Sequence, residues 1–546
     1  MGLAVGDSNA DPVSAELRSA EREIDAYYKR NDLVKLPFAV AAWHLMVSWE
    51  DAVLGAGLRA QDMLTESSWA AIADNLVFGM QYPFHWLWQS CASGGKVPQV
   101  CTRAAYDAAQ QLLRLSDDYV HFAVAFTYAS RHMVELELDG STIRTSPDMR
   151  PDTRYAAYDL LARRVEPNGE VDLANLIEVV ERSFRESGGA HTYDLSPRSV
   201  RCASETIAPL VQAKFTLPDD WEFEEYSMGE FRKAWTCLEA IAFLHHAARL
   251  IAATRGSGGT MHAGSVWTPT HEELLKRIGR YSGVPEGALA ALLGDLTYGA
   301  RGVRRPDPAI QPLIGLNNVQ YGIMASLVMA SSSERNLTVL LNRLPAQRDH
   351  YLTLVSSKED LMRQRIKQSL HPSSIRFYQG KIPGADDLPD IDLAMISDPE
   401  RLCLVLELKW FIEPAEVREV IEKSDEIRKG ISQLLLLRRA IVQNETPALR
   451  ALGIDATYEL SFAVVSANSI GIHTVQDPEV PVVRESDLVT KVRSTERLRD
   501  VSAWLSSRSF LPREGSDYEV VQQTRTIGQW SLEWYGIRLL VGSEPA

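Results

Sequence analysis

The chain has 546 residues, which is longer than one hydrophobic core usually supports, so two or three domains are expected. Hydrophobic residues make up 45% of the chain and charged residues 24%, as in ordinary soluble proteins, and no stretch reaches the ~18 uninterrupted apolar residues of a membrane helix. The formal net charge of −15 excludes a surface that is basic throughout, so a polyanion would have to bind at a local basic patch.

The beginning of the chain and the cysteines together predict a cytoplasmic protein with no membrane partner. Residues 1–25 lack a basic stretch followed by an apolar one, so no export signal is expected, and Gly6 replaces the Ser or Thr of an N-myristoylation motif. The five cysteines have no CxxC spacing, which argues against a disulfide framework or a zinc ribbon. Free, mostly buried thiols are expected instead.

Residues 1–300 are predicted to form a mainly helical region. Segments 103–133, 153–165 and 231–255 repeat apolar residues at three- and four-residue steps and contain no proline. The glycine-rich stretch 255–265 predicts a loop, and it lacks the Gly-Lys-Ser/Thr that a phosphate-binding P-loop requires. We expect this region to serve in sensing, in homo-oligomerisation or in docking a partner protein.

Residues 301–340 are predicted to join this region to a second domain. Asn317 and Asn318 tolerate the positive φ of a hairpin turn and have apolar flanks, so a β-hairpin followed by a helix is expected. Residues 341–546 alternate helices and strands. Within them, 483–510 predicts one amphipathic helix, and 519–540 predicts one or two strands that either extend the sheet of this domain or form a separate cap.

Chemically informative residues gather in the segment 381–411. Residues 389–396 and 402–410 predict two strands of an antiparallel hairpin, the second of which is apolar except for Glu407 and Lys409. Strand side chains alternate in direction, so these two residues share one face. Asp390 and Asp392 share a face of the neighbouring strand. Burying such a cluster is costly unless the charges are paired or bound to a cation, so the pattern predicts a site for a hard divalent metal.

The order Pro389-Asp390-x-Asp392 followed by Glu407-x-Lys409 resembles the PD-(D/E)XK nuclease superfamily, the restriction-endonuclease-like fold. The core of that family runs helix, three-stranded hairpin sheet, helix, strand. The predicted elements follow this order over residues 340–470: a helix at 358–370, a strand at 375–380, the hairpin, a helix at 416–442 and a strand at 459–467. The predicted fold class is therefore α+β multidomain, a large helical N-terminal region followed by an α/β nuclease core at 341–546 with a C-terminal extension.

The resemblance implies a role for each residue of the motif. Asp392 and Glu407 would be the carboxylate ligands of Mg²⁺, for which Mn²⁺ can substitute, and the main-chain carbonyl of Leu408 would be a third ligand. Asp390 is the alternative to Asp392. Lys409 would orient or help to deprotonate the attacking water and neutralise charge on the scissile phosphate.

Two further residues are candidates for the site. Many members of the family add an acidic residue from the first helix, where Glu359 lies on the stripe of Met362 and Ile366; a carboxylate that merely favours the helix dipole is the alternative. Gln433 lies where some branches place a glutamine, although its apolar neighbours also fit an amide at the edge of the core.

By this resemblance the chain would be a Mg²⁺-dependent endonuclease acting on nucleic acid, with DNA expected and RNA the alternative, similar to bacterial effectors of antiphage or anti-plasmid defence. Residues 343–381, with eight Lys and Arg against three acidic residues, would supply the local positive field, and Arg363, Arg365 and Lys367 would contact phosphates. The alternative function is a non-catalytic scaffold of this fold that binds nucleic acid or protein. A hairpin whose Asp392, Glu407 and Lys409 form only salt bridges is the purely structural interpretation.

Overall fold

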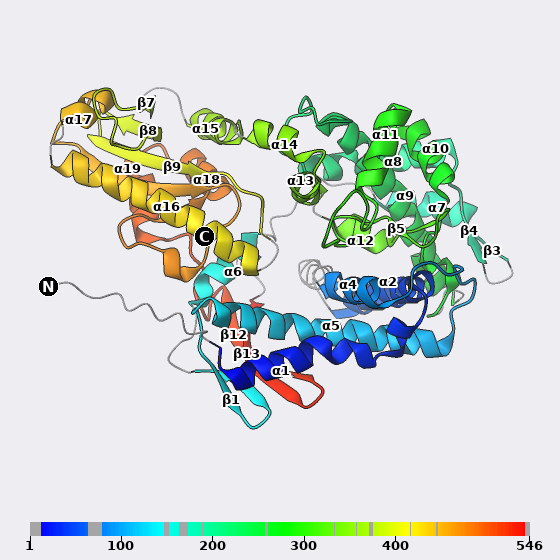
Figure 1. Ribbon diagram of the computed structural model, residues 1–546. Coiled ribbons are helices and arrows are strands. Elements are labelled where there is room, and N and C mark those ends of the chain that lie inside the picture. Colours follow the sequence, from blue (N-terminus) through cyan, green and yellow to red (C-terminus); the bar gives the residue numbers. More distant parts are fainter. Residues whose placement is uncertain are drawn as a thin grey trace.

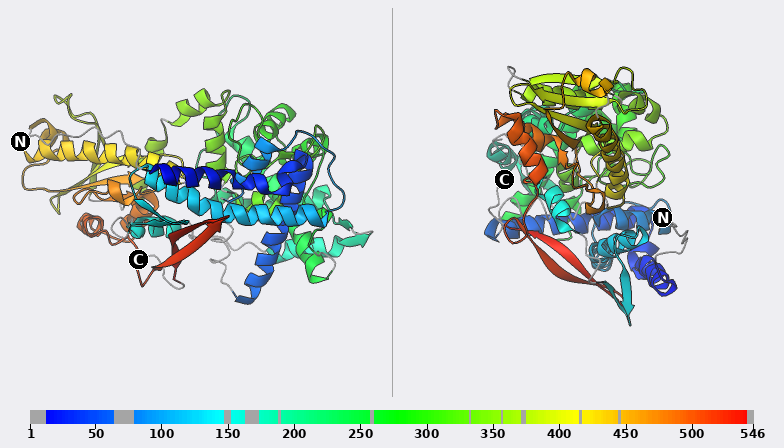
Figure 2. Two further views of the ribbon diagram at one scale, coloured as in Figure 1. Left: turned by 60° about the horizontal axis from the view of Figure 1, so that its bottom comes forward. Right: turned by 90° about the vertical axis from the view of Figure 1, so that its left-hand side faces the viewer.

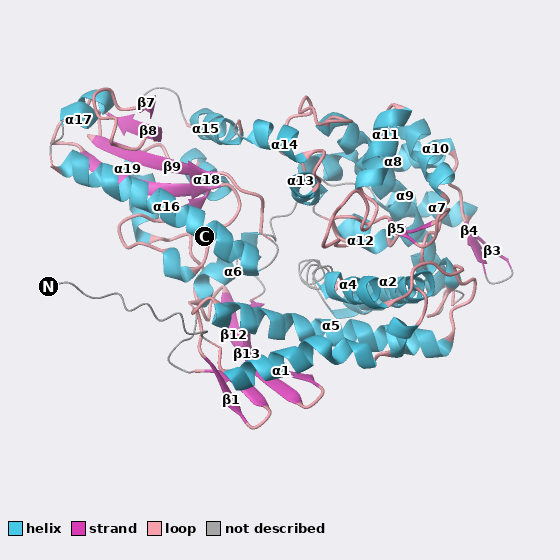
Figure 3. Cartoon of the chain, viewed as in Figure 1, coloured by secondary structure: helices cyan, strands magenta, loops and turns pink. Residues whose placement is uncertain are grey.

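The computed structural model describes residues 13–63, 79–146, 152–162, 173–187, 190–256, 260–331, 333–355, 357–370, 375–414, 417–443 and 446–540. The protein is mixed α/β, with helices throughout and strands in several small sheets (Figure 3). Among the described residues, no helix is both long enough and apolar enough to cross a membrane. All five cysteines are free, as the sequence predicts.

The described part of residues 1–300 is mainly helical, as predicted (Figure 1). Their helices are α1 (Ala15–Ala26), α2 (Phe38–Met63), α4 (Gln81–Ser90), α5 (Arg103–Ser130), α6 (Thr153–Ala162), α7 (Leu173–Ser183), α8 (Pro197–Ala213), α9 (Met228–Thr254), α10 (His271–Ser282) and α11 (Glu286–Asp295). Local signals set their ends: Ser227 and Glu230 form a capping box at the start of α9, and Gly283 ends α10 with φ of 68°. The region also contains the short strands β1 (Leu136–Asp139), β2 (Thr142–Thr145), β3 (Arg185–Ser187) and β4 (Ala190–Thr192), which the helical prediction missed.

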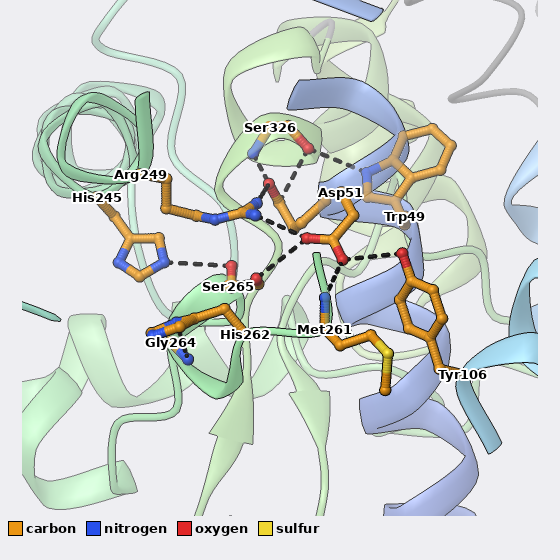
Figure 4. A network of polar contacts seen from close by, with 11 residues as sticks. Trp49, Asp51, Tyr106, His245, Arg249, Met261, His262, Gly264, Ser265 and Ser326 are labelled. Carbon is orange, nitrogen blue, oxygen red and sulfur yellow. Dashed lines mark hydrogen bonds and ion pairs between the residues drawn. The ribbon is translucent and has the colours of Figure 1, made fainter. Parts of the chain in front are cut away.

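A buried polar network holds α2, α5 and α9 together (Figure 4). Asp51 on α2 accepts hydrogen bonds from the Arg249 guanidinium at 2.8 Å, from the Tyr106 hydroxyl at 3.0 Å and from the Met261 main-chain N–H at 2.7 Å. The last of these bonds ties the end of the glycine-rich loop to the core. His245 lies beside the network and bonds to the Tyr193 hydroxyl and the Ser265 carbonyl, as a satisfied core histidine does.

The predicted junction contains the expected hairpin, but neither Asn317 nor Asn318 adopts the positive φ on which the prediction was based. Strands β5 (Ile314–Gly315) and β6 (Tyr321–Gly322) pair antiparallel around a turn in which the Asn317 side chain accepts hydrogen bonds from the main-chain N–H groups of Val319 and Gln320. The helices that follow are α12 (Ala325–Ala330), α13 (Ser333–Arg343) and α14 (Arg348–Val355). Their apolar residues pack on the core of α7–α11, and α13 also contacts the second half, since Arg335 forms an ion pair with Glu419 of α16 (Val417–Val442) at 3.2 Å.

The second half is built on a five-stranded sheet of order β11-β10-β9-β8-β7. Its strands are β7 (Ile375–Gly380), β8 (Ile391–Ser397), β9 (Leu402–Lys409), β10 (Glu459–Ser466) and β11 (Val482–Arg484). Strands β7, β8 and β9 are antiparallel, whereas β10 runs parallel to β9 and β11 runs parallel to β10. Parallel neighbours require a crossover, and α16 (Val417–Val442) provides it between β9 and β10.

Helices cover both faces of this sheet. One face carries Ala394, Val405 and Val464, which pack against α16 and α17 (Thr446–Leu452). The other face carries Leu393, Leu406 and Val465, which pack against α15 (Lys358–Ser369), α18 (Glu485–Arg493) and α19 (Leu498–Ser507). Because β8 and β9 are covered on both sides, a charged side chain on either strand must find a partner or an opening at the end of the sheet.

The prediction of a single helix over 483–510 is wrong. The chain forms two helices there, α18 and α19, with a break at 494–497. The hydroxyls of Ser494 and Thr495 both donate to the Lys491 carbonyl, so side chains take over the role of the next helical turn and α18 ends.

The C-terminal strands do not extend the five-stranded sheet. Strands β12 (Tyr518–Ile527) and β13 (Trp530–Leu539) form a long hairpin, and β13 pairs in parallel with β2 in a sheet of order β1-β2-β13-β12 (Figure 2). This sheet packs against α1 and α5. Helix α6 in turn contacts the second half, since Asp159 accepts a bond from Arg484 of β11 at 2.7 Å. The contacts of β2 with β13 and of α6 with β11 therefore join the two sides of the boundary predicted at residues 301–340.

Candidate active site

The structure brings Asp392 and Glu407 together across the β8–β9 hairpin. Leu393 is paired with Leu406, so the register places the next residues outward, Asp392 and Glu407, opposite each other at the end of the ladder. The Oδ2 atom of Asp392 accepts a hydrogen bond from the main-chain N–H of Leu408 at 2.8 Å. The aspartate is thus fixed to the strand that carries the glutamate and the lysine.

Lys409 forms an ion pair with Glu407. The Lys409 Nζ atom lies 2.6 Å from Glu407 Oε1, and the two side chains are 21% and 6% exposed respectively. Both lie on the α16 side of the sheet, whereas Leu406 and Leu408 face the other side, as strand alternation predicts. The pair therefore sits at the rim of the core, with only the lysine reaching toward solvent.

Burial and mutual repulsion shift the acid–base properties of both carboxyls. Burial and the charge of Asp392 raise the pKa of Glu407 to about 7, although Lys409 opposes this. Burial also raises the pKa of Asp392, against the Leu408 N–H bond and the positive charge of Lys409. Burial lowers the pKa of Lys409, but the carboxylates of Glu407, Asp392 and Glu359 together outweigh it and the pKa is raised overall. Perturbed carboxyls beside a lysine are typical of functional sites.

Glu359 lies beside the same cluster, at the start of α15. Burial and the negative charge of Asp392 raise the pKa of Glu359, while the positive charge of Lys409 and the nearby Trp410 main-chain N–H oppose the rise. The structure thus brings a third carboxylate to the end of β9. A residue that merely favours the helix dipole would not require this position beside β9.

The alternatives left open by the sequence differ in position. Asp390 is exposed and precedes β8, whereas Asp392 is partly buried and contacts β9. The Leu408 N–H points toward β8, and because the N–H and C=O of a strand residue point to the same side, its carbonyl is directed there too. Gln433 is exposed on α16, one turn beyond the residue that contacts the pair.

That contacting residue is Gly430, which the sequence analysis did not single out. A Cβ atom at this position would lie 3.1 Å from Glu407 Cγ and 3.1 Å from Lys409 Cε. Glycine therefore lets α16 approach the sheet closely enough to cover the stems of both side chains. The available signal was a glycine in the middle of a long helix, where glycine costs ~1 kcal/mol relative to alanine and needs a packing reason.

The basic residues of α15 are held by partners in this structure. Arg363 donates a hydrogen bond to the Asp392 main-chain carbonyl at 2.8 Å, so it fixes the start of β8 against α15. Arg365 pairs with Glu485 at 2.5 Å, and Lys367 bonds to Gln379 at 2.5 Å. Of these three basic residues, Arg363 is therefore the one that lies against the site.

The oxygen atoms at the site are of the kind that bind a hard cation, although the side chains are not arranged around one. Two carboxylates that repel each other, a nearby main-chain carbonyl and a third carboxylate are the oxygen ligands that Mg²⁺ prefers. As the side chains stand, the described part of the chain contains no group of three or more His, Cys, Asp and Glu residues arranged to hold a metal ion. No protein-family model, no curated protein and no solved structure matches the chain.

Proposed function

We propose that the protein is a Mg²⁺-dependent phosphodiesterase that cleaves nucleic acid inside the strand, with DNA as its substrate. The observation that carries this proposal is the contact of Asp392 with the strand of the Glu407–Lys409 ion pair, in a buried cluster where both carboxyl pKa values are raised. Without a cation the cluster is electrostatically unfavourable, which favours a site selected for binding one.

The order of the surrounding elements supports the same proposal. Helix α15, strands β7 to β9, helix α16 and strand β10 follow one another as in the core that the PD-(D/E)XK resemblance implies. Strand β10 pairs in parallel with β9, and α16 lies on the Glu407 face of the sheet. The order of the elements supports the proposal only at the level of the fold. The proposed reaction depends on the site residues themselves.

Each residue then has a defined task. Asp392 and Glu407 bind the cation, and the Leu408 N–H orients the Asp392 carboxylate for this purpose. A bound Mg²⁺ polarises a phosphate oxygen and lowers the pKa of a water molecule. Lys409 places its ammonium at the open side of the pair, where it stabilises the negative charge that develops on the phosphate during attack by water. Glu359 holds the end of β9 and is available to bind a cation-bound water.

The test is cleavage of supercoiled plasmid and of structured RNA by the purified chain, with Mg²⁺ and with EDTA. We expect cleavage of plasmid that requires the metal and is lost in Glu407→Gln and in Lys409→Met. Asp398→Asn is the matched control, because Asp398 is a carboxylate at the opposite end of the same hairpin that pairs with Arg376. Activity that survives both active-site substitutions refutes the proposal. A wild-type chain that binds DNA but neither cleaves it nor responds to Mg²⁺ supports the scaffold function instead.

A further inference from the structure

Lys358, the first residue of α15, is buried without a carboxylate partner. It is only 1% exposed, and in the described part of the chain no acidic side chain lies within ion-pair distance of its Nζ atom. The Nζ atom donates one hydrogen bond, to the Tyr351 hydroxyl at 2.9 Å. Burial lowers the pKa of Lys358 to about 6, although the charge of Glu334 opposes this, so near neutral pH the amine is mostly uncharged. A lysine buried at this cost calls for a function that outweighs it.

Three aromatic rings surround the side-chain nitrogen of Lys358. Its Nζ atom lies 3.2 Å from the ring centroid of Trp410, 4.7 Å from that of Tyr351 and 5.3 Å from that of Trp221. Ring faces accept the N–H groups of an amine weakly and attract the protonated form more strongly. We call these three residues the aromatic box.

The aromatic box joins the two halves of the molecule. Trp221 lies between α8 and α9, and together with Tyr351 it belongs to the hydrophobic core of the helical region. Trp410 directly follows β9 and packs on the core between the sheet and α15. Lys358 therefore lies where the two cores meet, and its Nζ atom contacts a ring from each.

Two consecutive residues of α15 contact Trp410, one at its ring and the other at its main chain. Lys358 contacts the indole ring, and the Glu359 carboxylate lies near the main-chain N–H, which lowers its pKa. Trp410 is the neighbour of Lys409, whose side chain points to the opposite face of the strand. A shift of Trp410 would therefore move Lys409 and Glu359 together.

We propose that Lys358 is a positioning residue that couples the helical region, through the aromatic box, to the Glu359–Lys409 end of the active site. This inference rests on the proposed function and specifies how the site is regulated. Contact between Trp221 and Lys358 holds Trp410 in place, so the site is complete when the helical region is docked. Displacement of the Trp221 segment, by a partner or by a second copy of the chain, loosens the end of β9 and weakens metal binding.

The test compares Lys358→Met, Trp221→Leu and the double variant in the full-length protein. The first measurement is the Mg²⁺ concentration that gives half-maximal cleavage, which each single change is expected to raise about tenfold or more, as loss of residues that orient metal ligands does. The double variant is expected to resemble the more affected single variant, because the two residues act through one contact. If the effects of the two single substitutions multiply in the double variant, the two residues act independently. That outcome would refute the coupling.

The second measurement, amide hydrogen exchange of the peptide containing Trp410 in metal-free protein, needs neither activity nor metal. We expect faster exchange in both single variants, because the Trp410 N–H lies near the Glu359 carboxylate and its surroundings loosen when the indole ring loses its contact. If the wild type does not cleave nucleic acid, the proposed function fails and the exchange result alone decides the inference. If cleavage is normal and neither exchange nor Mg²⁺ dependence changes, the function stands and the inference fails.

Two further variants separate positioning from loss of packing. Trp221→Phe keeps a ring face toward Lys358 and is expected to retain the Mg²⁺ dependence of the wild type, whereas Trp221→Leu is not. Trp267→Leu is the matched control, because Trp267 packs on the same helical core but is not part of the aromatic box. If Lys358→Met does not fold, the contrast between Phe and Leu at position 221 still decides the question. Equal behaviour of these two variants contradicts the proposal.

Discussion

Asp392 Oδ2 accepts the main-chain N–H of Leu408 at 2.8 Å, so this carboxyl performs a structural task while it also repels Glu407. Asparagine can accept the same bond without the charge. We therefore expect Asp392→Asn to abolish metal-dependent cleavage and to raise the melting temperature of the metal-free protein. Asp392→Ala loses the bond as well and leaves a buried N–H unpaired, which costs about 1–3 kcal/mol of unfolding free energy. A fall in the melting temperature of Asp392→Asn would contradict this account.

The raised carboxyl pKa values predict that Mg²⁺ binding strengthens as the pH rises. Burial and the charge of Asp392 raise the pKa of Glu407 from 4.5 to about 7, so the folded protein holds a proton there that the unfolded chain has lost. Stability of the metal-free protein therefore falls as the pH rises through this range. Mg²⁺ must displace that proton, so the rise in melting temperature on adding Mg²⁺ should be larger at about pH 8 than at about pH 6.

Glu407→Gln provides the control for this pH dependence, because the amide cannot titrate. We expect this variant to lose most of the metal-induced rise in melting temperature, and to lose with it the difference between the two pH values. Isothermal titration in two buffers with different ionisation enthalpies would measure the released proton directly. A metal response that does not change with pH in the wild type would contradict the assignment of the raised pKa to the metal site.

Gly430→Ala is expected to reduce cleavage by about tenfold or more, because small displacements of catalytic groups are costly. The added Cβ atom would lie 3.1 Å from both Glu407 Cγ and Lys409 Cε, so the pair must move. Alanine in a helix interior otherwise stabilises by ~1 kcal/mol relative to glycine. Gly287→Ala on α11, where a Cβ atom meets nothing within 4 Å, is the matched control and should keep full activity. Steady-state kinetics of the two variants decide the matter.

The hairpin of the candidate site could be predicted from the sequence because its determinants are local. An apolar run interrupted only by Glu407 and Lys409 defines a strand and its two faces, and a short turn fixes its neighbour. Helices α15 and α16 and strands β7 and β10 were predicted within a residue or two for the same reason: the apolar period changes clearly along this stretch.

Other features depend on contacts between residues far apart in the sequence. Pairing of β13 with β2 joins residues 531–533 to residues 142–144, and no local pattern specifies which distant edge a strand will choose. The close approach of Gly430 and the burial of Lys358 among Trp221, Tyr351 and Trp410 arise only when helices dock. In the sequence, Lys358 is simply one of several basic residues, and a buried role for it contradicts the usual exposure of lysine.

Arg249 is expected to be the most sensitive charged residue of the helical region. Its guanidinium lies 2.8 Å from Asp51 and 3.5 Å from Glu50, and all three side chains are at most 5% exposed. Arg249→Met would leave two buried carboxylates without a counter-charge, a loss that typically costs about 3–5 kcal/mol. Urea unfolding followed by circular dichroism should show an earlier transition of the helical region. Arg182→Met, which removes an exposed ion pair with Glu178, should leave that transition unchanged; equal effects of the two substitutions would contradict the structural role of the buried network.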